Sequence, residues 1–196
     1  MRIVSIRSRP KPVYGVGWND SDYRTQIRGQ PRFPYYVKWS GMLQRCYSIK
    51  WQENNPTYKG CLVCEDWLYF SNFRNWMENQ NWKDCELDKD ILGDGKLYSP
   101  TTCAFIPRQV NKFILGVDNV RGELPIGVIA RGSKYRASCQ NPFNKKQERL
   151  GTFCMIEEAA LAWRTKKLEH LETLKNMYNL TSEVFEGLKE VIYNRK

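Results

Sequence analysis

The stretch "IGVIARGSKYRASCQNPFNKKQERLGTFCMIEEAALAW", residues 126–163, decides the fold of this chain. Apolar and polar residues alternate through "IGVIARG", "KYRASCQ" and "RLGTFC", which is the pattern of short strands with one buried face. A tight Gly-Ser turn joins the first two segments, and the polar loop "NPFNKKQE" joins the second to the third. The stretch therefore predicts a three-stranded antiparallel sheet.

A long helix is predicted directly after this sheet. In "MIEEAALAWRTKKLEHLETLKNMY", residues 155–178, apolar side chains recur at helical spacing. A sheet with one apolar face needs a cover, and we expect this helix to provide it. The residues expected to meet in the resulting core are Tyr135, Ala137, Cys139, Phe153, Ala160 and Trp163. A short final helix is predicted in "SEVFEGLKEVIYN".

The part of the chain before residue 115 combines helices with extended segments. Helical spacing predicts one helix in "YYVKWSGMLQRCYSI" and another in "EDWLYFSNFRNWMENQ". In "CELDKDILGDGKLYSP", residues 85–100, a Gly-Asp-Gly turn predicts a hairpin, and "RQVNKFIL" predicts a helix after Pro107. The aromatic stripe of the second helix is expected to be core: Trp67, Phe70, Phe73, Trp76 and Met77. The whole chain is expected to be α+β.

The charge is strongly positive and unevenly distributed. The net charge is +10, with 11 basic and 3 acidic residues in 1–60, 6 and 8 in 61–114, and 14 and 10 in 115–196. Basic flanks suit a polyanion, and the acidic middle suits a divalent metal. Residues 1–34 are expected to form an extended basic arm that follows a nucleic-acid backbone. Its cations are Arg2, Arg7, Arg9, Lys11, Arg24, Arg28 and Arg32.

The sequence has seven cysteines, an odd number that favours thiols or metal ligands over disulfides. "CLVC" contains Cys61 and Cys64, a CxxC pair that supplies half of a zinc site, which Cys46, Cys85 or Cys103 would complete. The usual second CxxC is missing, and a small buried hydrophobe suits position 64 equally well. Buried thiols are therefore favoured over structural zinc.

In "YYVKWSGMLQRCYS", "YKGCLVCEDWLYFSNFRNW" and "LDKDILGDGKLYSPTTCAFIPRQVN" the chain resembles the His-Asn-His (HNH) endonucleases of the ββα-metal fold. The resemblance is closest to phage-borne relatives of homing endonucleases. It implies that an Asp and a helix Asn hold one divalent metal ion, such as Mg²⁺, while a His beside the Asp activates water. By position, Asp88 and Asn111 match the metal ligands, and Lys89 stands where the His belongs.

Lys89 changes the expected chemistry, because an unperturbed lysine has a pKa of about 10.4 and is protonated near pH 7. In one alternative, Asp88 and Asn111 still bind the metal, and metal-bound water or Asp90 replaces the His, giving a slow nickase. In the other, which we favour, Lys89 contacts a phosphate and cleavage has been lost. The chain's only histidine, His170, is expected to be an exposed or half-exposed residue of the late helix.

"IGVIARGSKYRASCQ" with "RLGTFCMIEEAALAW" is similar to the plant ethylene-response-factor (Apetala-two) DNA-binding domain. The resemblance implies that the outer face of the sheet enters the major groove of DNA. Five contact positions are carried over by the resemblance, and Lys134 and Arg136 are added by strand alternation. The full set is Arg131, Lys134, Arg136, Ser138, Gln140, Gln147 and Arg149. Ile126 and Ile129 stand where the plant domains usually have Arg, and the alternative is an ordinary solvated sheet face.

The sequence predicts an arm at 1–34, an HNH-like module at 35–115 and an Apetala-two-like domain at 116–196. We expect a phage-encoded protein of the homing-endonuclease type that binds double-stranded DNA, with weak or lost cleavage. The alternatives are an active metal-dependent endonuclease and a phage protein that binds a host protein. No apolar run approaches the roughly 18 residues of a membrane helix, and the N-terminus lacks a secretory signal. The expected location is the cytoplasm of the host cell.

Overall fold

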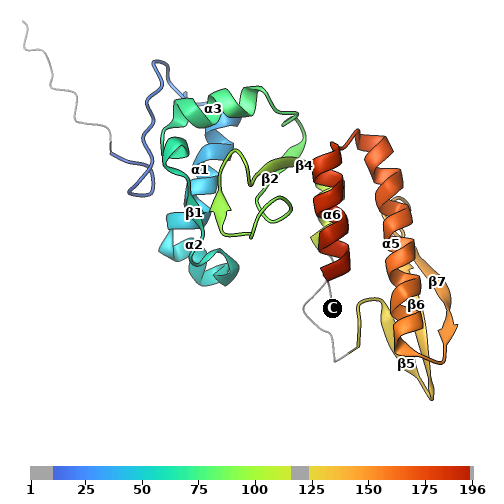
Figure 1. Ribbon diagram of the computed structural model, residues 1–196. Coiled ribbons are helices and arrows are strands. Elements are labelled where there is room, and N and C mark those ends of the chain that lie inside the picture. Colours follow the sequence, from blue (N-terminus) through green and yellow to red (C-terminus); the bar gives the residue numbers. More distant parts are fainter. Residues whose placement is uncertain (1–10, 116–123, 195–196) are drawn as a thin grey trace, which may run out of the picture. The chain divides into compact units, whose positions relative to one another are not determined.

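The computed structural model describes residues 11–115 and 124–194 (Figure 1). Both parts combine helices with strands, so the predicted α+β fold is confirmed. Contacts divide the chain into two units, Met1–Lys83 with Leu87–Phe105 and Asp84–Glu86 with Ile106–Lys196. The first is called unit 1 and the second unit 2. In the described residues no helix is both long and apolar enough to span a bilayer.

Unit 1 contains short helices and short strands. Its elements are α1 (Pro34–Tyr47), α2 (Ile49–Asn54), the 3₁₀ helices at Pro56–Tyr58 and Glu65–Leu68, β1 (Leu62–Val63), α3 (Phe70–Glu78) and β3 (Leu97–Tyr98). Pro34 opens α1 at the position where its fixed φ suits a helix and its missing N–H is not needed. The two helices predicted here are thus present, the second one beginning as a 3₁₀ turn.

The core of unit 1 is largely aromatic. Trp39 of α1 is fully buried and donates a hydrogen bond from Nε1 to the carbonyl of Trp67 at 2.7 Å. The predicted aromatic stripe is confirmed as core, because all five of its residues lie in this cluster and only Trp76 is partly exposed. Edge-on and tilted ring pairs, such as Trp67 with Phe73 at 5.1 Å, add to the apolar burial.

The predicted hairpin at residues 85–100 is wrong. β2 (Cys85–Asp88) pairs with β4 (Ala104–Pro107), whereas β3 pairs in parallel with β1. Local bonds explain the difference, because the side chain of Asp88 accepts from the N–H groups of Asp90 and Ile91 and turns the chain immediately after β2. The helix predicted after Pro107 is present as α4 (Arg108–Leu115).

Residues 11–33 contain no helix or strand, but they are not a detached arm. Val13, Val16 and Tyr23 pack against the core of unit 1. Gly17 lies where a Cβ would come within 2.3 Å of the side chain of Leu43, so the backbone approaches α1 closely. The first ten residues of the expected basic arm, which include Arg2, Arg7 and Arg9, lie outside the described residues.

Unit 2 contains α4 and the predicted three-stranded sheet. The strands β5 (Val128–Arg131), β6 (Lys134–Gln140) and β7 (Gln147–Phe153) are antiparallel in the order β5-β6-β7. Gly132 has a φ of 59° in the two-residue turn between β5 and β6, a conformation that suits a tight hairpin. The expected linker falls largely within residues 116–123, which lie outside the described residues.

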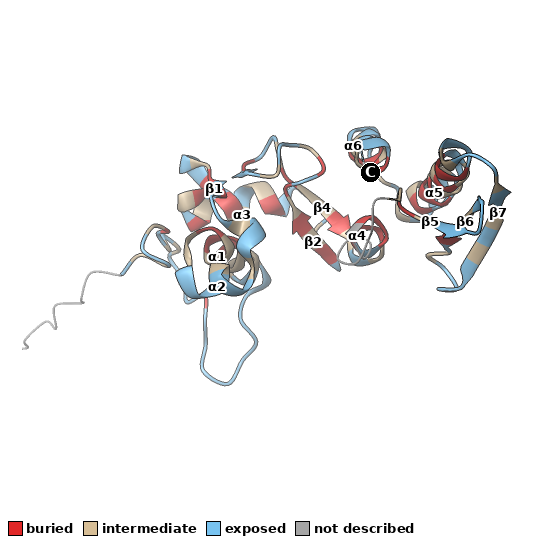
Figure 2. Cartoon of the chain, turned by 90° about the horizontal axis from the view of Figure 1, so that it is seen from below, coloured by how far each residue is buried: buried red, intermediate tan, exposed pale blue. Residues whose placement is uncertain are grey.

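The long helix α5 (Ile156–Tyr178) covers one face of the sheet, as predicted (Figure 2). Ala137 and Ala160 belong to one buried cluster, and Tyr135 and Phe153 pack against it. Glu157 and Glu158 lie in the first turn of α5, where negative charge favours the helix dipole. Asn179, with a φ of 48°, ends α5 before α6 (Ser182–Asn194) begins.

Candidate nucleic-acid interface

All seven predicted contact residues lie on the face of the sheet that points away from α5. The register pairs Arg131 with Lys134, Ser138 with Arg149, and Gln140 with Gln147. In β6 these residues alternate with the buried Ala137 and Cys139, which face the helix. We call this set the sheet face: Arg131, Lys134, Arg136, Ser138, Gln140, Gln147 and Arg149.

A β-bulge places the residues of β7 on this face. Ala137 is the Cα partner of Gly151 and Ser138 that of Arg149, so Leu150 is an extra residue in β7. Without the extra residue, strict alternation from Gly151 would turn Arg149 and Gln147 toward α5. The bulge therefore brings two predicted contact residues to the outer face.

The polar end of the sheet face is ordered by side-chain hydrogen bonds. Gln147 donates from Nε2 to Oγ of Ser138 at 3.1 Å, and Gln140 donates to the carbonyl of Lys145 at 3.2 Å. Each of these amides keeps further donor and acceptor capacity, since a glutamine side chain has two donors and a carbonyl oxygen. Such side chains can pair with the edges of bases.

The other end of the sheet face is a cluster of cations. The pKa of Arg136 lies below its ordinary value, because of partial desolvation and then because Arg131 and Arg149 are nearby positive charges. No acidic residue belongs to the sheet face, whereas Glu148 of β7 points the other way and binds Asn141. A bound polyanion would relieve the mutual repulsion of the three guanidinium groups.

The two isoleucines that replace arginines of the plant domains have different surroundings. Ile126 is buried, with 8% of its surface exposed, so it belongs to the interior of unit 2 and not to the sheet face. Ile129 is 40% exposed and lies opposite Arg136. Of the two isoleucines, therefore, only Ile129 lies among the cations of the outer face.

Lys89 lies in the interior of unit 1 and not on the surface, which corrects the expectation that it contacts a phosphate. The residue is 5% exposed, its Nζ donates to Oδ1 of Asp90 at 2.7 Å, and the rings of Tyr58 and Tyr98 lie 5.4 and 5.8 Å from Nζ. Burial lowers the pKa of Lys89, but the hydrogen bond and charge of Asp90 raise it, and the net value lies above the ordinary one. Lys89 is therefore protonated and cannot act as a base.

Asp88 and Asn111, the expected metal ligands, have separate partners. Oδ1 of Asp88 accepts the N–H groups of Asp90 and Ile91 at 2.8 and 3.1 Å, and burial raises the pKa of its carboxyl group. Asn111 donates from Nδ2 to Oε2 of Glu86 at 2.5 Å, while its Oδ1 is buried without a hydrogen-bond partner. Asp88 belongs to unit 1 and Asn111 to unit 2, so a metal ion shared by them stays a prediction.

Four of the expected zinc cysteines are thiols within unit 1, namely Cys46, Cys61, Cys64 and Cys103, and the fifth candidate, Cys85, is buried in unit 2. Burial, and then the nearby thiol of Cys61, raises the pKa of Cys46 to about 12, and burial raises the pKa of Cys103 to about 12. Cys61 directs its Sγ to the carbonyl of Gly95 at 3.6 Å. Cys64 is partly buried, and burial raises its pKa as well. Within 11–115 and 124–194, no group of three or more His, Cys, Asp or Glu side chains is placed to hold a metal ion.

His170 is buried, so the expectation of an exposed helix residue was wrong. Only 6% of its surface is exposed, and its Nε2 lies 3.2 Å from Oε2 of Glu148. The rings of Phe113 and Phe143 meet the imidazole edge-on at 6.5 and 6.1 Å. Burial lowers the pKa of His170 despite the opposing charge of Glu148. Because its ring is buried among these partners, His170 is a structural residue of unit 2.

Three exposed cations that sequence reasoning did not select line a groove in unit 2. Arg108 and Lys112 lie four residues apart on α4, and Lys145 lies in the loop after β6. The spacing of Arg108 and Lys112 was the available signal, because residues i and i+4 share one face of a helix. Neither their position beside the sheet nor that of Lys145 follows from the local sequence.

No family model, curated protein or solved structure matches this chain. The interpretation of the site therefore depends on its geometry and charge.

Proposed function

We propose that this protein binds double-stranded DNA through the sheet face of unit 2. The observation that supports this proposal most directly is that all seven predicted contact side chains share one solvent-facing surface without an acidic residue. Neighbouring strands lie about 4.8 Å apart, so three strands span about 10 Å, comparable with the roughly 12 Å major groove of B-DNA.

The two ends of the sheet face suit different parts of the duplex. Arginine forks onto guanine or onto phosphate oxygens, and lysine mostly neutralises phosphate. Gln140 and Gln147 offer amides that pair with adenine. The proposed complex thus combines backbone contacts at the hairpin end with base contacts at the amide end.

We propose further that the protein is of the phage HNH homing-endonuclease-like type and that its cleavage activity is weak or lost. In support, Lys89 occupies the position of the general base, is buried and holds its proton through Asp90. General-base catalysis typically contributes about 10²–10⁴-fold, so its loss leaves DNA binding as the main activity.

Binding is tested by measuring the affinity of the full chain for duplex DNA at several salt concentrations. Replacing Arg131 and Arg149 by alanine should weaken binding and make its salt dependence less steep by about 1.8 in logarithmic slope. Lys166→Ala with Lys189→Ala is the matched control, since both lysines pair with carboxylates on their own helices and lie off the sheet face. Equal affinities of the two double variants would contradict the assignment.

A second candidate function is metal-dependent nicking of DNA. It is favoured by the Oδ1 atom of Asn111, a buried oxygen without a hydrogen-bond partner and of the type that Mg²⁺ prefers. When bound, a divalent ion would activate water and stabilise the charge on the scissile phosphate. Nicking of supercoiled plasmid with Mg²⁺ or Mn²⁺ that is abolished by both Asp88→Ala and Asn111→Ala would establish this activity. Plasmid that stays intact at protein concentrations that bind the duplex would support binding without cleavage.

A further inference from the structure

We propose that Arg108, Lys112 and Lys145 form a second line of phosphate contacts, which binds the backbone of the duplex that lies on the sheet face. We call these three residues the groove cations. The inference rests on the proposed DNA binding and adds α4 to the interface.

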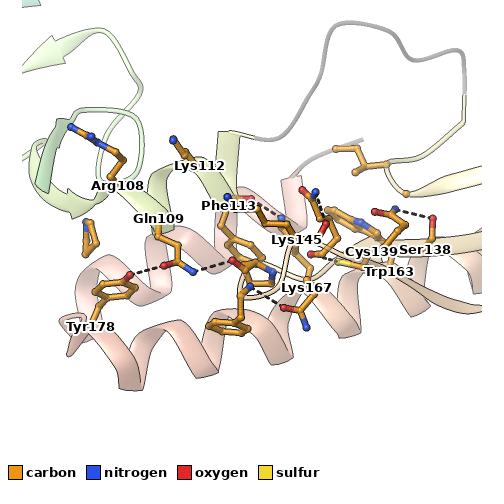
Figure 3. A pocket seen from close by; sticks show the side chains of 18 of the residues that line it. Arg108, Gln109, Lys112, Phe113, Ser138, Cys139, Lys145, Trp163, Lys167 and Tyr178 are labelled. Atoms are coloured by element: carbon orange, nitrogen blue, oxygen red, sulfur yellow. Dashed lines mark hydrogen bonds between the residues drawn. The ribbon is translucent and has the colours of Figure 1, made fainter. Parts of the chain in front are cut away.

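The groove cations line a cavity of about 880 Å³ that lies entirely within unit 2. Its apolar lining residues include Phe113, Ile126 and Trp163, and Asp84 and Lys167 line it as well. Arg108 and Lys112 point away from α5, whereas Gln109 and Phe113 of the same helix point toward Tyr178 and Lys167 (Figure 3). One side of α4 is thus buried while the other presents two positive charges.

Three hydrogen bonds fix α4 within unit 2. Gln109 donates to the carbonyl of Pro142 at 3.0 Å and accepts from the hydroxyl of Tyr178 at 2.7 Å. The buried Nζ of Lys167 donates to the carbonyl of Phe113 at 2.6 Å and lies 3.5 Å from the centre of its ring. Because the helix is held in place, binding a phosphate orders only the ends of two side chains, which limits the entropic cost.

The groove cations are accessible to a ligand. The side chain of Arg108 is 70% exposed and uses only Nε in its 3.2 Å bond to Glu86, which leaves four of the five guanidinium N–H donors for phosphate. Lys112 and Lys145 are exposed. Glu86 is the carboxylate that pairs with Arg108, and its second oxygen accepts from Asn111.

The groove is continuous with the sheet face, because Ser138, Gln140 and Gln147 belong to both. Along β6 the cations lie at the hairpin end and the amides at the other end, next to the loop that carries Lys145. A duplex with its bases over the amides has one phosphate backbone on each side. The hairpin cations would bind one backbone and the groove cations the other.

The test compares four full-length proteins in duplex-binding titrations over a series of salt concentrations. They are the wild type, Arg108→Ala with Lys112→Ala, Arg131→Ala with Arg149→Ala, and the control Lys166→Ala with Lys189→Ala. We expect the groove variant to lose affinity and to reduce the salt slope by about 1.8, as the sheet variant does. Lys145→Ala should reduce the slope by about 0.9.

The outcomes separate this inference from the proposed function. If the wild type and the sheet variant differ but the groove variant binds like the control, DNA binding stands and the second line of contacts is refuted. If the wild type does not bind duplex DNA in dilute buffer, the proposed function fails as well. Arg108→Gln with Lys112→Gln, whose unfolding by urea is measured alongside, provides a second groove variant that removes both charges but keeps polar side chains with good helix propensity.

Discussion

Ile129 lies directly opposite Arg136 across the antiparallel pair of β5 and β6 and is 40% exposed on the sheet face. This side chain is an apolar gap among the cations of the sheet face. Replacing it by arginine should raise the affinity for duplex DNA and steepen the logarithmic salt dependence by about 0.9, since one more phosphate would be neutralised. The measurement is a binding titration at several salt concentrations.

Leu161→Arg is the matched control for this gain of charge. Leu161 is 62% exposed but lies on α5, which packs against the opposite side of the sheet. The control should change the affinity little. If both arginines strengthen binding equally, overall charge and not the sheet face determines the affinity.

Gly127 is predicted to be the least replaceable glycine of unit 2. Its φ is +78°, and an added Cβ would lie 2.0 Å from Cδ1 of Trp163 and 2.7 Å from the carbonyl oxygen of Ser138. Gly127→Ala should therefore reduce the free energy of unfolding by about 2–4 kcal/mol, from backbone strain together with overpacking. Gly132 also has a positive φ but has no atom within 4 Å of an added Cβ, so Gly132→Ala should cost only about 1–2 kcal/mol. Urea denaturation of both variants checks the difference, and equal losses would contradict it.

Lys89 should stabilise unit 1 mainly through its apolar stem. Its partner Asp90 has a side chain that is 60% exposed, so solvent weakens the ion pair. Lys89→Met, which keeps the stem, should cost less than about 1 kcal/mol, and Lys89→Ala about 1–3 kcal/mol in urea denaturation. Because the folded-state pKa is raised, the charged form contributes stability below its ordinary pKa, and this is lost as the pH rises through the folded value. The wild type should therefore lose its advantage over Lys89→Met only in strongly alkaline buffer.

His170 should make the protein less stable in mildly acidic buffer. Its pKa is lowered by burial, so below about pH 6.5 the unfolded chain takes up a proton that the folded chain does not, and stability falls with pH. His170→Gln should make the melting temperature depend less on pH between pH 7.5 and 5.5. The chain has no other histidine, so an unchanged pH dependence in this variant would refute the assignment.

The periodicity of apolar residues and the turn signals in the sequence were sufficient to predict the main elements of unit 2. Alternation in residues 126–153 predicted three strands, and helical spacing predicted α5 and its contact with the sheet, because each pattern leaves one apolar face that needs a partner. The same reasoning did not predict the bulge at Leu150, since an extra residue in one strand changes the pairing without a distinct composition. Only the resemblance to a known domain assigned Arg149 and Gln147 to the outer face, where the strand pairing puts them.

Long-range pairing was the main limit in unit 1. The Gly-Asp-Gly segment has the local form of a hairpin, but β2 pairs with β4 and β3 pairs with β1, and neither partner is the nearest strand in the sequence. The burial of Lys89 and His170 was also missed. Both residues are usually near the surface. The groups that enclose them come from distant segments, Tyr58 and Tyr98 around Lys89 and Glu148 beside His170.

The three hydrogen bonds that hold α4 have a consequence for how this chain can be divided. A fragment that begins at residue 124 would contain the sheet, α5 and α6 but would leave Tyr178 and Lys167 without Gln109 and the Phe113 carbonyl. Transfer of the sheet to another protein would have to include residues 106–115. The smallest piece that can be transferred therefore begins before residue 116, where the sequence predicts the domain boundary.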